Sequence, residues 1–142
     1  MDHRRRILVV DDEENVLFVM HDALTRLGAE YEIVTAQNGH EALDKVRAMP
    51  FDLVITDLRM PGLDGVALTE AIKALNPGTV VIWMTAYGCH NVQDAAARLM
   101  VYTCLEKPVE VAAIWRTVRE ALESSGEKGK QRQETLGQHK RR

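Results

Sequence analysis

The sequence contains few cysteines and no long apolar run. Its two cysteines, Cys89 and Cys104, lie 15 positions apart without a CxxC pattern. The spacing used by zinc sites is therefore absent, and a disulfide framework is not expected. No apolar stretch approaches the roughly 18 residues that a membrane span requires, and the apolar run after residues 4–6 stops at Asp11, too early for a signal peptide. We therefore expect a cytoplasmic protein with reduced thiols and no membrane contact.

Length and composition indicate one domain with an uneven charge. The 142 residues suffice for a single core, and 46% hydrophobic and 27% charged residues are ordinary values for a globular protein. Residues 127–142 hold six basic and two acidic residues, although the whole chain carries −3. We expect a domain over residues 1–125 and, over residues 126–142, a mostly disordered basic tail, linker or vector-derived remnant. The tail lacks interleaved aromatics and a recognition fold, so direct nucleic-acid binding is not expected.

Short apolar runs alternate with helical patterns along the chain. Short apolar runs are typical of parallel strands that are buried on both faces. The expected strands are residues 7–10, 31–36, 51–57, 80–85 and 102–106, and the expected helices are residues 14–27, 39–48, 66–75, 91–100 and 109–124. This alternation predicts one α/β domain, a doubly wound (βα)5 arrangement with five parallel strands and helices on both faces.

Polar residues stand at the ends of four of these apolar runs. The acidic pair Asp11-Asp12 follows the first run, and Asp57 ends the third. Thr85 ends the fourth run, and Lys107 follows the fifth. Because the ligand site of an open α/β sheet lies at the carboxyl ends of its strands, we expect these five side chains to meet in one crevice.

Phosphoryl transfer is the chemistry that such a set favours. A carboxylate can attack phosphorus and form an aspartyl phosphate. Crowded carboxylates repel one another, and Mg2+, which prefers oxygen ligands, relieves that repulsion and neutralises charge during transfer. A lysine ammonium can hold one phosphoryl oxygen and a threonine hydroxyl another. Each residue alone also fits an ordinary role, such as an acidic loop, a strand-end hydroxyl or a surface lysine, but their joint placement favours the functional interpretation.

The segments that carry these residues resemble the receiver domain of two-component response regulators. The matching sequences are ILVVDDEENV, FDLVITDLRMPGLDG, VVIWMTAYG and LEKP, which occur in this order and at the spacing of that family. Together they cover roughly residues 5–124. The resemblance implies a flavodoxin-like receiver fold with strand order 2-1-3-4-5 that accepts a phosphoryl group from a histidine kinase.

The resemblance also implies a role for each acidic residue. Asp57 corresponds to the phosphoacceptor. Asp12 and Asp57 would ligate Mg2+ directly, together with the backbone carbonyl of Arg59. Asp11 would act mainly through a bound water, and Mn2+ would be a substitute for Mg2+.

The same comparison implies roles for Lys107, Thr85 and Ala86. Lys107 would pair with Asp57 before phosphorylation and contact a phosphoryl oxygen afterwards, with a cis Lys107-Pro108 bond aiming the lysine. Thr85 would be the switch hydroxyl that moves toward the new phosphoryl group, and the amide of Ala86 would donate to that group too.

One position departs from the family pattern. Three residues before the lysine the family usually has Tyr or Phe, whose ring moves inward with the threonine; here that residue is Cys104. The switch then works through residues 91–100 and the loop before them, or Tyr102 substitutes for the missing ring, or the coupling is weak. Of these alternatives, the first is favoured.

Three further residues are candidates at the edges of the site. Arg59 and Tyr87 stand two residues after Asp57 and Thr85, where the resemblance implies control over water reaching the acyl phosphate. Phe18 is off the apolar stripe of the first helix, so it is either a partly exposed side chain or a docking contact for a kinase or phosphotransfer partner.

The function implied is a phosphorylation-driven signalling switch and not a conventional turnover enzyme. The surface of the fourth helix, fifth strand and fifth helix would read the phosphoryl group and often dimerises in this family. No output domain is recognised in the sequence.

One alternative function is that of a phosphohydrolase of the haloacid dehalogenase type, but such enzymes place an Asp where Arg59 stands. The other is a phosphate-independent binding module, against which the intact acidic set argues.

Overall fold

The five strands form one parallel sheet. The computed structural model describes residues 4–134, and the side chains of residues 4–124. The strands are β1 (Arg5–Val10), β2 (Tyr31–Ala36), β3 (Leu53–Asp57), β4 (Val80–Thr85) and β5 (Thr103–Glu106). Their order across the sheet is β2-β1-β3-β4-β5, and every neighbouring pair is parallel. The predicted (βα)5 fold with strand order 2-1-3-4-5 is therefore confirmed.

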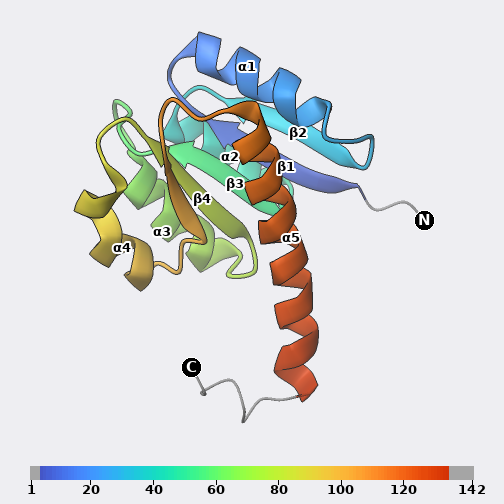
Figure 1. Cartoon of the computed structure of the whole chain (residues 1–142). Coiled ribbons are helices and arrows are strands. Elements are labelled where there is room, and N and C mark those ends of the chain that lie inside the picture. Colours follow the sequence, from blue (N-terminus) through green and yellow to red (C-terminus); the bar gives the residue numbers. More distant parts are fainter. Residues whose placement is uncertain (1–3, 135–142) are drawn as a thin grey trace.

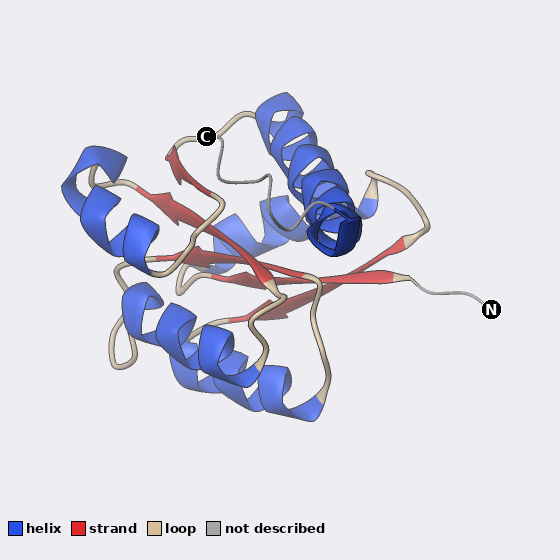
Figure 2. Cartoon of the chain, turned by 90° about the horizontal axis from the view of Figure 1, so that it is seen from below, coloured by secondary structure: helices blue, strands red, loops and turns tan. Residues whose placement is uncertain are grey.

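Helices cover both faces of this sheet, as Figures 1 and 2 show. They are α1 (Glu14–Thr25), α2 (Gly39–Ala48), α3 (Gly65–Leu75), α4 (Gln93–Arg98) and α5 (Val111–Glu134), with a 3-10 turn η1 (Cys89–Val92) before α4. One core cluster joins α1 and α5 to the sheet, and a second joins α2, α3 and α4 to the opposite face. No helix between residues 4 and 134 has both the length and the apolarity needed to cross a bilayer.

Polar groups in the interior tie one helix to the sheet and two helices to each other. The indole Nε1 of Trp83 in β4 donates to Thr69 Oγ1 at 2.8 Å, and this hydroxyl donates to Gly65 O at 2.7 Å within α3. On the other face, Trp115 Nε1 donates to Ala23 O at 2.6 Å and joins α5 to α1. These bonds satisfy groups whose burial would otherwise cost free energy.

The start of α3 lies close against the end of β3. Asp64 Oδ1 accepts from Ala67 N at 2.9 Å and so caps the start of this helix. Gly65 follows, and a Cβ at this residue would collide with the carbonyl oxygen of Asp57. Glycine at position 65 therefore permits the close approach of α3 to the strand that carries Asp57.

Two helix predictions were inaccurate. The helix expected over residues 91–100 is instead η1 followed by the six-residue α4. The last helix does not end at residue 124 but continues to Glu134. Lys, Gln, Arg and Glu, which have high helix propensity, predominate from residue 127 to 134. Polarity alone had suggested disorder there; the rest of the predicted tail, residues 135–142, lies outside the described residues.

The expectation of reduced thiols was wrong, because Cys89 and Cys104 form a disulfide. Cys104 lies in β5 beside Trp83 of β4, and Cys89, which begins η1, donates its backbone N–H to Glu106 of β5. The two Cα atoms are consequently 5.8 Å apart, within the range that a disulfide spans. Neither the spacing of 15 residues nor the missing CxxC pattern could reveal this contact, which depends on the pairing of β4 with β5.

Candidate functional site

The predicted acidic residues meet where the strand order reverses. Asp11 follows β1, Asp57 ends β3, and these central strands are neighbours. Asp11 is fully buried and Asp57 is 6% exposed, whereas Asp12 is open to solvent. One carboxylate oxygen from each of the three lies within 4.8 Å of the others. The three carboxylates expected at the strand ends therefore converge in one place, called the acidic crevice below, and Asp12 is the one that faces solvent.

Lys107 bridges the two buried carboxylates. Its Nζ donates to Asp11 Oδ2 at 2.8 Å and to Asp57 Oδ2 at 3.2 Å. Its backbone N donates to Thr85 O at 2.9 Å, and the Lys107-Pro108 peptide is cis, as predicted. The sequence suggested the Asp57 contact but not the shorter one to Asp11.

Burial and charge act in opposite directions on this pair. Burial raises the pKa of the Asp57 carboxyl, and the charge of Asp11 adds to the rise, which the nearby Lys107 only partly offsets. Burial alone would lower the pKa of Lys107, but the hydrogen bonds and charges of Asp11 and Asp57 together outweigh it and raise that pKa. The ammonium is therefore held in its charged form between two carboxylates.

The donor set of this crevice suits a hard divalent cation. Asp57 Oδ1 accepts from Leu58 N at 2.7 Å, and Asp11 Oδ1 accepts from Glu13 N at 3.0 Å, so backbone amides fix both carboxylates. Asp12 contributes a third, solvent-facing carboxylate. Three converging carboxylates match the oxygen-ligand preference of Mg2+, which usually keeps several waters. The residues present therefore fit the predicted metal.

Thr85 and the loop after it border the same crevice. Thr85 is buried, and its Oγ1 accepts from Tyr87 N at 3.1 Å, so the hydroxyl is engaged with its own loop. Ala86 is exposed. The Arg59 guanidinium lies 4.1 Å from the centroid of the Tyr87 ring, and a groove lined by Arg59, Thr85 and Tyr87 opens here. The two residues predicted to flank the site thus contact each other.

The residues near the usual aromatic switch position occupy different environments. Cys104 lies within β5 and is bonded to Cys89. Tyr102 precedes the strand, its side chain is exposed, and its backbone N donates to Val81 O at 2.8 Å. Glu106 was missed by the sequence analysis; its Oε2 accepts from Cys89 N at 2.9 Å. Only the parallel register, which pairs Glu106 with Thr85, could have pointed to it.

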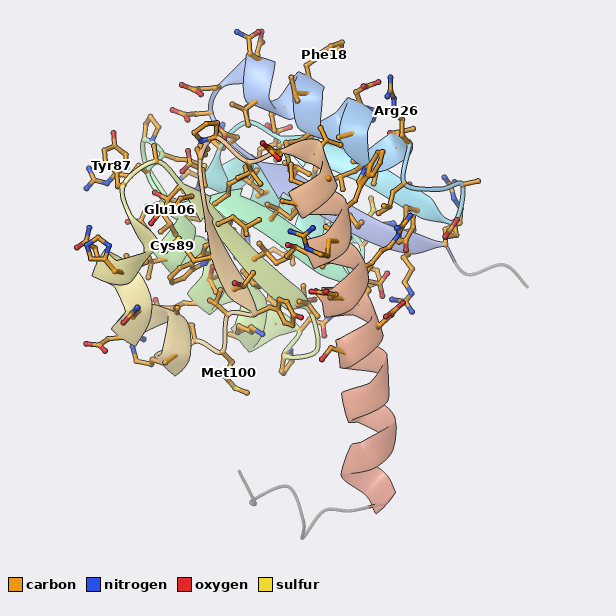
Figure 3. The ribbon with its side chains drawn as sticks, viewed as in Figure 1. Phe18, Arg26, Tyr87, Cys89, Met100 and Glu106 are labelled. Atoms are coloured by element: carbon orange, nitrogen blue, oxygen red, sulfur yellow. A yellow bond between two sulfur atoms is a disulfide. The ribbon has the colours of Figure 1, made fainter. Side chains whose placement is uncertain are left out.

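Phe18 lies on α1, four residues after the helix begins. It is 75% exposed, and Figure 3 shows its side chain pointing away from the body of the molecule. A groove beside it is lined by residues of α1, β2 and α2, including His21 and Lys45. The exposure excludes a packing role for this ring and leaves it available to a partner.

A family model for the response regulator receiver domain matches residues 7–119. The chain therefore belongs to this family of receiver domains. It is a signalling family and not a conventional enzyme family, in keeping with the kind of function expected from the sequence.

Known relatives and structures agree with this assignment. The chain is 38% identical over 126 residues to the transcriptional regulatory protein GlrR of Escherichia coli K12, covering 88% of this chain but only 28% of that regulator. It is 32% identical to sporulation initiation phosphotransferase F of Bacillus subtilis, covering 82% of this chain and 93% of that protein. A CheY-like receiver domain protein of Methanospirillum hungatei superposes with a TM-score of 0.83 at 26% identity, covering 88% and 98% of the two chains.

Proposed function

We propose that this receiver domain accepts a phosphoryl group on Asp57 from a sensor histidine kinase or phosphotransfer protein. The observation that carries the proposal is the contact of Lys107 with both Asp11 and Asp57. A buried carboxylate, an ammonium already beside it and two further carboxylates are the parts that phosphoryl transfer to aspartate requires.

In the proposed reaction an oxygen of Asp57 attacks the phosphorus of a phosphohistidine. The new O–P bond forms as the N–P bond breaks, and the electron pair of that bond returns to the histidine ring. Asp12, Asp57 and the carbonyl of Arg59 would hold Mg2+, or Mn2+ in its place, with Asp11 acting through a water. The bound cation would neutralise charge on the phosphoryl oxygens. Lys107 would then exchange its contact with Asp57 for one with a phosphoryl oxygen.

The readout proposed for the phosphoryl group begins at Thr85. Its hydroxyl would leave Tyr87 N and donate to the phosphoryl group, together with the amide of Ala86. The loop after β4 would shift as a result, and with it α4, which has no buried residue. Phosphorylation would thus change the population of conformations of the surface formed by α4, β5 and α5.

Partners are proposed for two separate surfaces. The exposed Phe18 on α1 supports docking of a kinase or phosphotransfer partner there. Transfer from a panel of phosphorylated sensor kinases should slow in Phe18→Ser while uptake from phosphoramidate is unchanged; equal transfer would exclude this contact.

The surface of α4, β5 and α5 exposes Met100 and Tyr102 and is proposed to form a homodimer or to contact an output domain in the cytoplasm. Light scattering before and after phosphorylation tests the dimer, and a monomer in both states would refute it.

The deciding experiment measures intact mass after incubation with phosphoramidate and Mg2+. We expect the wild type to gain one phosphoryl group, and Asp57→Asn or removal of Mg2+ to abolish the gain. The exposed Asp44→Asn is the matched control and should gain the group normally. No gain in a folded wild type would refute the proposal and favour a phosphate-independent binding module.

A further inference from the structure

The Cys89–Cys104 disulfide lies outside the acidic crevice but close to its switch residue. Cys89 opens η1, four residues after Thr85, and Cys104 lies in β5, three residues before Lys107. Both cysteines are half-buried, so the bond does not lie inside the fully buried core. The disulfide is therefore a covalent link between the loop that follows Thr85 and the strand that leads to Lys107.

A second contact reinforces this link. Cys89 N donates to Glu106 Oε2 at 2.9 Å, and Glu106 is opposite Thr85 in the register of β4 and β5. Figure 3 shows Tyr87, Cys89 and Glu106 gathered at the same edge of the molecule, away from Phe18. The loop is thus held to β5 by one covalent bond and one hydrogen bond to a charged group.

This link restrains the segment that phosphorylation would have to move. Thr85 Oγ1 accepts from Tyr87 N, so turning the hydroxyl toward Asp57 breaks a bond within residues 85–87. Gly88, with φ of 86°, gives this segment backbone freedom, but Cys89 fixes its far end. With the disulfide closed, only residues 86–88 can absorb the movement.

We propose that Cys89 and Cys104 form a reversible redox site, open to exchange with a low-molecular-weight thiol, and that closing the disulfide slows phosphorylation of the receiver. The effect on phosphorylation rests on the proposed function. Cytosolic disulfides are usually transient, catalytic or redox-sensing and not permanent. Opening this bond leaves both core clusters intact, because Cys104 only packs against the edge of one and Cys89 belongs to neither.

The exchange is a two-electron reaction that proceeds through a mixed disulfide. A small thiolate attacks one sulfur of the Cys89–Cys104 bond, forming a mixed disulfide while the other cysteine leaves as a thiolate and takes up a proton. A second small thiolate attacks the small-molecule sulfur of the mixed disulfide, which releases the remaining cysteine, also protonated, and a small-molecule disulfide. Two small thiols are oxidised, one protein disulfide is reduced, and the reverse reaction closes the bond.

The redox site is tested without phosphorylation. The folded protein is equilibrated with mixtures of reduced and oxidised glutathione, free thiols are alkylated, and intact mass gives the reduced fraction. We expect one reversible transition with unchanged circular dichroism. A bond that opens only on unfolding, or thiols that never pair in oxidised glutathione, would refute the redox site.

The coupling is tested by the rate of phosphoryl uptake from phosphoramidate with Mg2+. We expect the reduced protein to take up the phosphoryl group at least about fivefold faster than the oxidised protein. A factor of about five is the lower end of the coupling typically found between two sites. The double variant Cys89→Ser/Cys104→Ser should react at the rate of the reduced protein, and added reductant should not change that rate. Equal rates in the two redox forms would refute the coupling. If neither form gains a phosphoryl group, the proposed function fails and the coupling with it, whereas the glutathione titration still decides the redox site.

Discussion

The ends of β3 and β5 lie at the same edge of the sheet but differ in burial and bonding. Every residue of β3 is buried, and its last residue, Asp57, is held by a backbone amide and by Lys107. No residue of β5 is fully buried, and a disulfide ties that strand to the preceding turn. The central strand β3 holds Asp57 by packing on both faces, whereas β5, at the edge of the sheet, has a covalent bond in addition to its pairing with β4. The carboxylate of Asp57 and the edge strand that leads to Lys107 are therefore held by different forces.

The largest effect is expected from removing the ammonium of Lys107, which follows β5 and contacts Asp57 at the end of β3. Lys107→Met leaves the buried Asp11 beside Asp57 without a counter-charge, which should cost roughly 3 kcal/mol of unfolding free energy. Urea unfolding in EDTA measures the loss, and added Mg2+ should restore more stability to the variant than to the wild type. Lys73→Met is the matched control, because Lys73 Nζ donates to the neutral carbonyl of Thr79. A variant as stable as the wild type in EDTA would contradict this view of the site.

Reducing the disulfide that holds the edge strand β5 should also lower the free energy of unfolding, but by less. The bond closes a loop of 15 residues, for which the loss of chain entropy in the unfolded state corresponds to about 3 kcal/mol, less any strain. Urea unfolding with and without reductant gives the difference, and Cys89→Ser/Cys104→Ser should not respond to reductant. If reduction left the unfolding midpoint unchanged, the disulfide would not be a stabilising element of this edge.

A gain in stability is expected from neutralising Asp57. Burial raises the pKa of this carboxyl in the folded state, so its ionised form opposes folding above that pKa. Asp57→Asn should therefore unfold at a higher temperature than the wild type at pH 8 in EDTA. The advantage should shrink as pH falls through the folded pKa, because the wild type then binds a proton that favours folding. The exposed Asp44→Asn should show no such trend, and a constant difference across pH would contradict this explanation.

The smallest stability effect is expected where the loops after β3 and β4 meet, at Arg59 and Tyr87. Tyr87 is 56% exposed, so loss of its contact with the guanidinium should cost about 0.5–1 kcal/mol. The ring is proposed to shield the acyl phosphate, and Tyr87→Ala should change the rate of dephosphorylation, followed by intact mass. Phe18→Ala removes another exposed ring, outside the groove that Tyr87 lines, and should leave the rate unchanged when no partner protein is present. An unaltered rate in Tyr87→Ala would refute the shielding role.

The sequence predicted the central part of the molecule better than its edge. Apolar runs ending in Asp57 or followed by Asp11 mark buried parallel strands, because burial on both faces leaves a continuous apolar pattern. These runs therefore predicted the (βα)5 arrangement and the convergence of the acidic residues, whereas the strand order followed from the resemblance to receiver domains. The contact of Lys107 with Asp11 could not, because it depends on side-chain geometry across 96 residues of sequence.

Edge elements gave weaker signals for a physical reason. The helix α4 has six residues and none is buried, so no apolar stripe sets its bounds. The continuation of α5 to Glu134 rests on local propensity, which a polarity argument overlooks. The disulfide required the register of β4 and β5, which pairs Trp83 with Cys104 and which only the folded sheet defines.

Because of this register, the fluorescence of Trp83 depends on the state of the disulfide. Trp83 is fully buried and lies opposite Cys104 on a neighbouring strand about 4.8 Å away. A disulfide accepts an electron from an excited indole and so quenches its emission, whereas a thiol quenches less. Trp115 is on the opposite face of the sheet, among the α1 and α5 contacts. In a Trp115→Phe variant, the fluorescence intensity of Trp83 would therefore report, without an added label, whether Cys89 and Cys104 form a disulfide.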